Sequence, residues 1–233
     1  EILIGLVGSE MCIRDSDIRY HHLETTLDGV PVELHFFPGI MNNPIYNARL
    51  QKWFKRNADL QCSNVVSLPD GIGEIAIPTT AFNVIYQLTH LYHHFFDEGI
   101  GIRQITDYYY VVNNNELLVV RDALQKELKH LGLWKFARAV MYVLHEALGL
   151  SEEKMIAPLD EKRGKLLLAE ILNGGNFGQH FTKYGHFTQQ GMAKKYFLKI
   201  WRNMHFVRYY PAEALSEPIF RTWHFFWRMK NKK

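Results

Sequence analysis

The dipeptide Asp28-Gly29 constrains the fold most strongly, because it separates two stretches of alternating apolar and polar residues, "HHLETTL" and "VPVELHF". A two-residue type I′ turn requires positive φ at both central positions, and Asp-Gly is one of the pairs that favour it. The sequence therefore predicts an antiparallel β-hairpin with strands at about 18–26 and 31–37.

The position of the turn also sets the register of this hairpin. With residues 28 and 29 as the loop, the opposing pairs are Leu27 with Val30, Thr25 with Val32, Glu24 with Glu33, and His22 with His35. Opposing residues point to the same side of a hairpin, and successive residues alternate between sides. We expect an apolar face, packed on helices, that consists of Leu23, Val32, Leu34 and Phe36.

The opposite, polar face of the hairpin admits two interpretations. Glu24 and Glu33 lie across from each other, and two opposed carboxylates destabilise a sheet unless a cation compensates them. A divalent metal ion held by Glu33, Glu24 and His35 would be such a cation, and so would a nearby Arg or Lys. The alternative is a solvated sheet face on which the long side chains splay apart.

The composition indicates a folded protein and excludes several function classes. Hydrophobic residues make up 47% of the 233 residues, which supports a sizeable core. Two cysteines form neither a disulfide framework nor a Cys-based zinc site, which fits a reducing cytoplasm. No apolar run reaches the roughly 18–20 residues of a membrane span, so no membrane partner is expected. The net charge of +3 is too small to indicate nucleic-acid binding, although basic residues gather in the C-terminal "RTWHFFWRMKNKK".

The first sixteen residues, "EILIGLVGSEMCIRDS", do not continue sensibly into the hairpin. They lack the basic region that precedes the apolar stretch of a signal peptide. The piece "GLVGSEMCIRDS" resembles a translated sequencing adapter at the edge of a metagenomic read, so we expect 1–16 to be a non-native segment and the natural N-terminus to be missing. The alternative is a genuine short strand over residues 2–7.

The rest of the chain predicts a small β-rich part, 17–77, followed by a helical part, 78–233. Together these give an α+β fold in which a small antiparallel sheet precedes mostly helical structure. Residues 58–77 are expected to be loop-like, with short extended pieces at 64–68 and 74–77. The Gly-rich stretch 173–191 is expected to be an ordered surface loop. Caps, breakers and apolar periodicity predict helices at about 44–56, 79–96, 102–112, 116–131, 133–147, 160–172, 192–207 and 218–229.

The helix predicted at 79–96 carries the most informative pattern. Asn83, Gln87, His90, His94 and Asp97 recur at steps of four and three and form one polar stripe beside an apolar one. Histidines four residues apart can share a metal ion or a phosphate. On the next helix, Arg103 and Asp107 are also four apart and can pair with each other. These residues form either a site or a structural polar seam between packed helices.

Two blocks, "HHLETTLDGVPVELHFFPG" and "PTTAFNVIYQLTHLYHHFFDEGIGIRQITDYYYVV", resemble an uncharacterised nucleotidyltransferase-like family of the DNA polymerase β superfamily. Members of that family carry a Gly-Ser or Gly-Gly turn and a strand with two metal-binding aspartates, and a later strand supplies a third carboxylate. The resemblance implies that Glu33 is this third, catalytic carboxylate. It also implies Mg²⁺ as the cofactor and a nucleoside triphosphate and an unknown acceptor as substrates.

The resemblance further implies that the helical part contacts the acceptor through His90, His94, Arg103 and Asp107. No Gly-Ser turn followed by an Asp-x-Asp strand occurs with suitable spacing in the sequence, because Gly8-Ser9 and Asp15-Ser16-Asp17 only imitate it. The chain is therefore expected to be an incomplete and inactive nucleotidyltransferase. One alternative is a non-catalytic binding or scaffold module of the same fold. The other alternative, which is less favoured, is a helical protein that binds nucleic acid through its basic, aromatic C-terminus.

Overall fold

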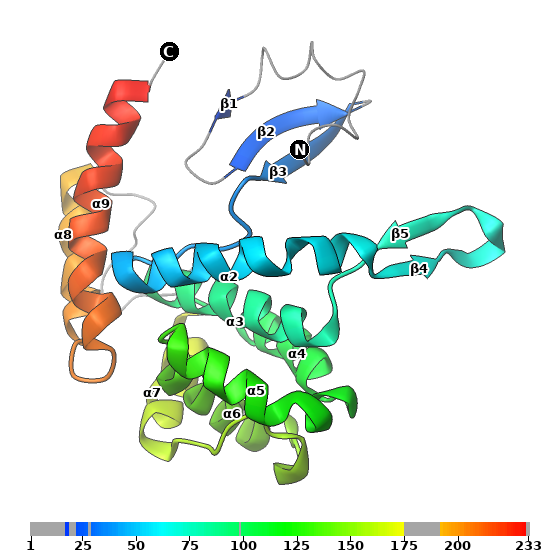
Figure 1. Ribbon diagram of the computed structural model, residues 1–233. Helices are drawn as coiled ribbons and strands as arrows, with labels where there is room; N and C mark the ends of the chain where they lie inside the picture. Colours follow the sequence, from blue (N-terminus) through cyan, green and yellow to red (C-terminus); the bar gives the residue numbers. More distant parts are fainter. Residues whose placement is uncertain (1–16, 19–21, 28, 98, 175–191, 232–233) are drawn as a thin grey trace.

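The computed structural model describes residues 17–18, 22–27, 29–97, 99–174 and 192–231, and it confirms the α+β class. Figure 1 shows a body of helices with the N-terminal sheet above it and a second, two-stranded sheet projecting as an arm. In chain order the elements are β1 (Asp17–Ile18), β2 (His22–Leu27), β3 (Val30–His35), α2 (Pro44–Ser63), β4 (Val65–Ser67), η2 (Pro69–Gly71), β5 (Glu74–Ala76), α3 (Thr80–Asp97), α4 (Ile102–Val112), α5 (Glu116–His130), α6 (Trp134–Leu148), η3 (Glu152–Lys154), α7 (Glu161–Gly174), α8 (Met192–Met204) and α9 (Pro211–Asn231).

The first sheet has the predicted hairpin and register. β1, β2 and β3 pair antiparallel in that order, and every opposing pair of β2 and β3 is the one that the turn position predicts. Gly29 adopts a φ of 79°, the left-handed conformation that a type I′ turn needs and that glycine adopts without strain. Backbone geometry therefore places positions 24 and 33 directly opposite each other.

The apolar face of this hairpin is only partly as expected. Leu23 is buried, and Val32 and Leu34 are half-buried. β3 ends at His35, however, so Phe36 leaves the strand and is 50% exposed. The prediction that Phe36 packs in the apolar face is wrong, because the chain turns at Pro38-Gly39 and breaks the alternation two residues earlier than assumed.

α3 is the central helix of the body. Its predicted apolar stripe is buried completely, with Val84, Leu88, Leu91 and Phe95 at most 3% exposed. The helices α4 and α5 pack against it, α6 packs against α4 and α5, and α7 packs on α6. At the contact between α6 and α7, Gly164 leaves no room for a Cβ atom beside the ring of Tyr142, which allows the two helices to approach closely.

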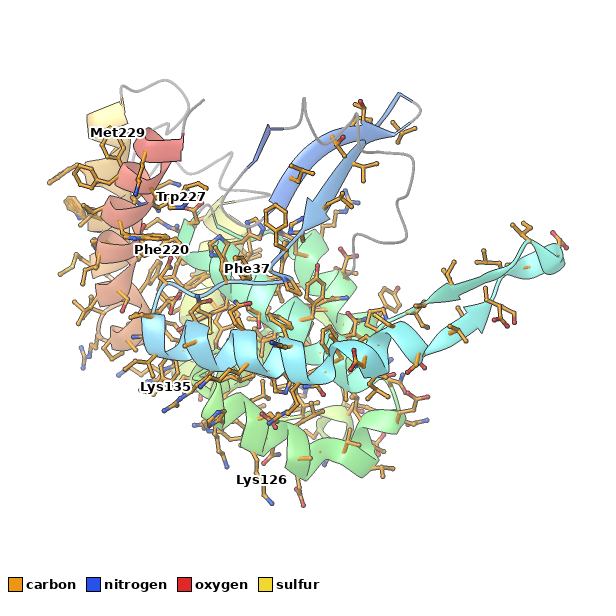
Figure 2. All side chains as sticks on the ribbon, turned by 45° about the horizontal axis from the view of Figure 1, so that its top comes forward. Phe37, Lys126, Lys135, Phe220, Trp227 and Met229 are labelled. Carbon is orange, nitrogen blue, oxygen red and sulfur yellow. The ribbon has the colours of Figure 1, made fainter. Side chains whose placement is uncertain are left out.

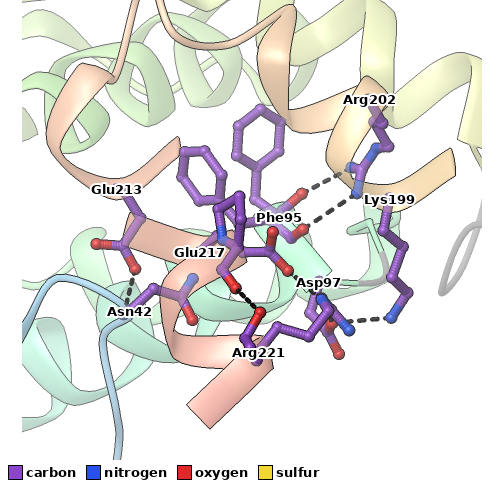
Figure 3. Close-up of polar contacts among 11 residues, drawn as sticks. Asn42, Phe95, Asp97, Lys199, Arg202, Glu213, Glu217 and Arg221 are labelled. Carbon is purple, nitrogen blue, oxygen red and sulfur yellow. Dashed lines mark hydrogen bonds and ion pairs between the residues drawn. The ribbon is translucent and has the colours of Figure 1, made fainter. Parts of the chain in front are cut away.

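α8 and α9 lie side by side along one edge of the body, as Figure 1 shows. A polar network holds them there (Figure 3). Asp97 Oδ1, at the end of α3, accepts hydrogen bonds from Lys199 Nζ of α8 at 2.8 Å and from Arg221 Nη2 of α9 at 2.7 Å. Burial alone would raise the pKa of Asp97, but Lys199, Arg221 and His93 hold it well below its usual range.

Two further buried contacts fix α9 and α8 to the body. The carboxylate of Glu213, in the first turn of α9, accepts the backbone N–H groups of Asn42 and Asn43 at 2.6 and 3.2 Å. The guanidinium of Arg202 on α8 donates to the carbonyl oxygens of Phe95 and Phe96 (Figure 3). Each of these side chains is therefore committed to holding helices together.

Most predicted helices are confirmed, and three boundaries are wrong. The helix expected at 192–207 ends at Met204. The helix expected at 44–56 continues to Ser63, because Asn57 and Gln61 donate their side-chain amides to carbonyls of the preceding turn and no Gly or Pro interrupts it. The helix expected to begin at Pro218 begins at Pro211 instead, and Pro218 lies inside it. Anchoring of Glu213 and burial of Ala214 offset the cost of an internal proline, about 3 kcal/mol.

Two sequence-based expectations lie outside the described residues: the foreign origin of 1–16 and, from residue 175 on, the ordered loop at 173–191. Residues 173 and 174 belong to α7. Across the described parts of the chain, no helix combines the length and the apolar character required to cross a membrane.

Candidate functional site

The candidate site lies where the end of β3 meets α3. The hairpin register places Glu24 opposite Glu33 and, two positions further along the strands, His22 opposite His35. Residues 33 and 35 therefore occupy the same face of β3. The side chains of Glu24 and Glu33 lie outside the described part of the structure, so their position is known from the backbone register alone.

α3 contributes a cluster of imidazoles to this place. The ring centroids of His90 and His94 are 4.3 Å apart, one helical turn from each other, and those of His93 and His94 are 5.8 Å apart. His35, at the end of β3, is close enough to lower the pKa of His90. The structure thus brings one residue from the polar face of the hairpin together with three from the helix.

The environment of this cluster keeps His90 neutral. Desolvation lowers its pKa most, and repulsion from His94, His93 and His35 lowers it further, to about 4. His90 nevertheless keeps contact with solvent at its surface, whereas His93 and His94 are half-buried. At neutral pH the cluster therefore presents an uncharged, accessible imidazole that can donate or accept a hydrogen bond.

Arg103 and Asp107 lie elsewhere. Both are exposed on α4, and neither forms a hydrogen bond or ion pair with the histidines, with the other, or with any further residue among those described. In this structure the expected Arg103–Asp107 contact is therefore not formed. Their side chains remain available at the surface of the helix that follows the histidines.

The polar stripe of α3 divides into two parts with different roles. At one end, the Gln87 amide donates to Asn83 Oδ1 at 3.1 Å, and at the other, Asp97 is occupied by Lys199 and Arg221. Asp97 thus belongs to a structural polar seam between packed helices, which was one of the two interpretations that the pattern left open. Only the middle of the stripe carries the imidazole cluster.

His93 belongs to the cluster, although the helical periodicity did not single it out. It lies one residue out of the polar stripe, and its ring approaches that of His94. It also lowers the pKa of both His90 and Asp97, so it lies between the imidazole cluster and the α8–α9 attachment. The adjacent pair His93-His94 in the sequence was the available signal.

The two parts of the site differ in the metal ions that they could bind. In the described portion of the chain, no three His, Cys, Asp or Glu side chains are grouped closely enough to hold a metal ion. Imidazoles suit zinc and other transition metals, whereas Mg²⁺ prefers carboxylate oxygens and water. The carboxylates of Glu24 and Glu33, opposed on the hairpin, have the chemistry that Mg²⁺ requires, and the histidines do not.

Comparison with known proteins gives a match over the part of the chain that contains this site. A family model described as "uncharacterised nucleotidyltransferase" matches residues 9–149, a range that contains the hairpin and α3. The match begins inside the segment for which a non-native origin is expected. No curated protein and no solved structure matches the chain.

Proposed function

The chain belongs to the family of uncharacterised nucleotidyltransferases, and from this premise we propose that its hairpin and α3 form part of a site for metal-dependent nucleotidyl transfer. The observation that carries the proposal is the register of β2 and β3. It sets Glu24 opposite Glu33 on the strand face that also bears His35, and His35 in turn lies near His90 of α3. The register thus puts positions 24 and 33 on the strand face of His35, which lies near the neutral imidazole of His90.

Glu33, with Glu24 across the hairpin, would hold Mg²⁺ in this site. When bound, the ion neutralises charge on the nucleotide phosphates during in-line displacement. Two opposed carboxylates repel each other without a cation, so their pairing at positions 24 and 33 costs free energy that metal binding would recover.

The imidazole cluster would bind the acceptor. A neutral His90 does not repel the metal ion, and it can accept a hydrogen bond from an acceptor hydroxyl. The ring of His94 lies one turn away, with its centroid 4.3 Å from that of His90. Arg103 and Asp107, exposed on α4, are available for contacts with a larger acceptor.

Catalysis requires more carboxylates than this part of the chain supplies. Two glutamates cannot complete the shell of the ion, and residues 17–233 contain no Gly-Ser turn followed by an Asp-x-Asp strand. We therefore expect no nucleotidyl transfer by the 233-residue chain with Mg²⁺ and any nucleoside triphosphate. An extended chain that carries these motifs ahead of the hairpin is expected to give activity.

The test is transfer of label from α-phosphate-labelled nucleotides by three proteins: the chain, an extended chain with a Gly-Ser turn and an Asp-x-Asp strand added ahead of the hairpin, and that extended protein carrying Glu33→Gln. Glu33→Gln should abolish activity, because the amide keeps the shape but loses the charge that binds the ion. The matched control is Glu74→Gln on β5, an exposed strand glutamate in the other sheet, which should leave activity unchanged.

Transfer by the 233-residue chain would contradict the requirement for further motifs. Full activity of the extended Glu33→Gln protein would remove Glu33 from the metal site. Binding of nucleotide by the extended protein without any transfer would instead favour a non-catalytic module of the same fold.

The nucleic-acid alternative loses support from the structure of α8. Lys199 and Arg202, two cations of α8, are directed into the molecule, where they contact Asp97 and the carbonyls of Phe95 and Phe96. An intramolecular role accounts for both.

A further inference from the structure

The α8–α9 pair carries an unusual concentration of exposed apolar side chains. Nine of the 22 large apolar residues that are exposed in the described chain lie on these two helices. They are Phe197, Trp201 and Met204 on α8, and Leu215, Ile219, Trp223, Phe225, Phe226 and Met229 on α9. Such a patch is larger than scattered surface residues explain, and it indicates an interaction surface.

Eight of these nine side chains form two stripes along the helices, and Phe225 lies beside one of them. On α9, residues 215, 219, 223, 226 and 229 follow at steps of four and three, and residues 197, 201 and 204 do the same on α8. A shallow hollow of about 480 Å³ lies along the α9 stripe between Pro218 and Phe226. In Figure 2, Phe220 and Trp227 lie on the side of α9 toward the body of the molecule, so the helix presents a second apolar side beyond the one it uses for packing.

The charge of this part of the chain is one-sided. From residue 171 to 233 the sequence contains eleven Lys or Arg and only two carboxylate side chains, Glu213 and Glu217. Both carboxylates are at most 2% exposed. No Asp or Glu of these 63 residues therefore reaches the surface, and the remainder of the chain, with sixteen Lys or Arg and 22 Asp or Glu, is acidic.

Cations lie at both ends of the apolar stripes. Arg208 is exposed in the turn between α8 and α9, and Lys230 is exposed in the last turn of α9. Arg228, Lys232 and Lys233 stand beside Lys230 in the sequence. Lys199, Arg202 and Arg221 do not add to this surface charge, because they are engaged inside the molecule.

We propose that the α8–α9 face docks on the surface of an anionic lipid bilayer, with both helices lying in the interface. Exposed Trp, Phe, Ile and Met side chains beside Lys and Arg, with no exposed acid on the same segment, are the pattern of an interfacial amphipathic helix. The negative surface potential of anionic lipids complements the charge, and the headgroup region accommodates the aromatic rings. The lack of spanning segments in the sequence predicted no membrane partner, and this surface association is of a different kind.

Two other occupants fit the observations less well. A second copy of the chain would bring the same excess of positive charge to the interface and repel. A single-stranded nucleic acid would match the cations and the tryptophans, but Leu215, Ile219 and Met229 offer no ring on which a base can stack.

The first test is co-sedimentation of the chain with vesicles of phosphatidylcholine, with and without phosphatidylglycerol. We expect binding that requires the anionic lipid and weakens as salt screens the charges. The double variant Ile219→Glu/Phe226→Glu should weaken binding about tenfold or more, because it places charge in the apolar stripe. The matched control is Ile72→Glu/Val119→Glu, which changes two apolar residues that are at least as exposed, one beside η2 and one on α5.

Two charge-reversal variants keep the test valid if the first variant folds poorly. Arg208→Glu/Lys230→Glu alters only exposed side chains and should also lose binding. Lys55→Glu/Lys126→Glu makes the same change in net charge on α2 and α5 and should retain it. Circular dichroism and thermal melting of each variant establish that it is folded.

Several results would overturn the proposal. These are no binding to anionic vesicles, equal binding to vesicles of phosphatidylcholine alone, or equal losses in the test and control variants. Two further results would assign the face to another occupant. One is a concentration-dependent dimer that Ile219→Glu/Phe226→Glu abolishes without any vesicle binding. The other is binding of single-stranded RNA that replaces binding to vesicles.

Discussion

At the scale of single residues, the candidate site depends on the state of one imidazole. His90 is partly desolvated and surrounded by His94, His93 and His35, and its pKa falls to about 4. Because this pKa lies below the value of an unfolded histidine, the associated stability is present at neutral pH. It is lost as the pH falls from about 6.5 towards 4, since the unfolded chain then binds the proton more readily.

This arrangement gives a prediction for the pKa of His90. His94→Gln should raise it, because the substitution removes the imidazole whose electrostatic interaction lowers it most and keeps a polar side chain one turn away. The measurement is an NMR titration of the imidazole C–H signals. His130→Gln, an exposed histidine at the end of α5, should leave the pKa of His90 unchanged. An unaltered pKa in His94→Gln would show that the two rings are not coupled.

The sequence predicted part of this residue-level picture. The period of α3 grouped His90 with His94, and the Asp-Gly turn fixed the opposition of Glu24 and Glu33. The approach of His35 to His90 could not be predicted, because it depends on how the sheet sits against α3. The role of Asp97 was equally hidden, since its partners Lys199 and Arg221 follow more than one hundred residues later.

At the scale of elements, α9 is attached to the body of the molecule through Glu213, whose burial makes ionisation of the carboxyl group unfavourable. Burial raises the pKa of Glu213 to about 7, although the backbone N–H groups of Asn42 and Asn43 lower it. A folded pKa above the unfolded value of 4.5 means that the folded state retains the proton longer. This contribution to stability is therefore full below pH 4.5 and is lost as the pH rises through 7.

We expect the free energy of unfolding to fall by up to about 3 kcal/mol between pH 5 and 8 on account of Glu213. Glu213→Gln should remove this contribution to the dependence of the free energy of unfolding on pH. The slopes of that dependence are compared, and not the absolute stabilities, because the amide also replaces an accepting oxygen with a donor and so changes stability at every pH. Urea unfolding at each pH measures it, and the exposed Glu152→Gln should retain the wild-type slope. Equal slopes for Glu213→Gln and wild type would contradict the raised pKa.

Element boundaries were predictable where local chemistry decides them. The helix at 102–112 was predicted at its observed bounds, because Gly101 and the asparagines at 113–115 mark its ends. α9 was misplaced because two prolines, Pro211 and Pro218, offer the same signal for a first helical turn. The choice between them depends on the tertiary contact of Glu213 with Asn42 and Asn43, which no local pattern reveals.

At the scale of the whole molecule, the two proposed surfaces belong to different parts of the chain. The acidic N-terminal 170 residues contain the hairpin, α3 and the candidate site, and the basic remainder contains the α8–α9 face. Asp97 joins them, since it ends the helix that carries the histidines and holds both α8 and α9. Docking through α8–α9 would therefore fix the position of α3 relative to the docked surface.

The central claim, that the polar face of the hairpin and the histidines of α3 form one metal-associated site, can be tested without any enzymatic activity. Mn²⁺ substitutes for Mg²⁺ at carboxylate sites and broadens the NMR signals of nearby nuclei. We expect titration with Mn²⁺ to broaden the imidazole signals of His35, His90 and His94 before that of His130, and excess Mg²⁺ to reverse the effect. Glu33→Gln should remove the broadening, and Glu74→Gln should preserve it. Equal broadening of all histidines, or broadening at His90 that persists in Glu33→Gln, would contradict the claim.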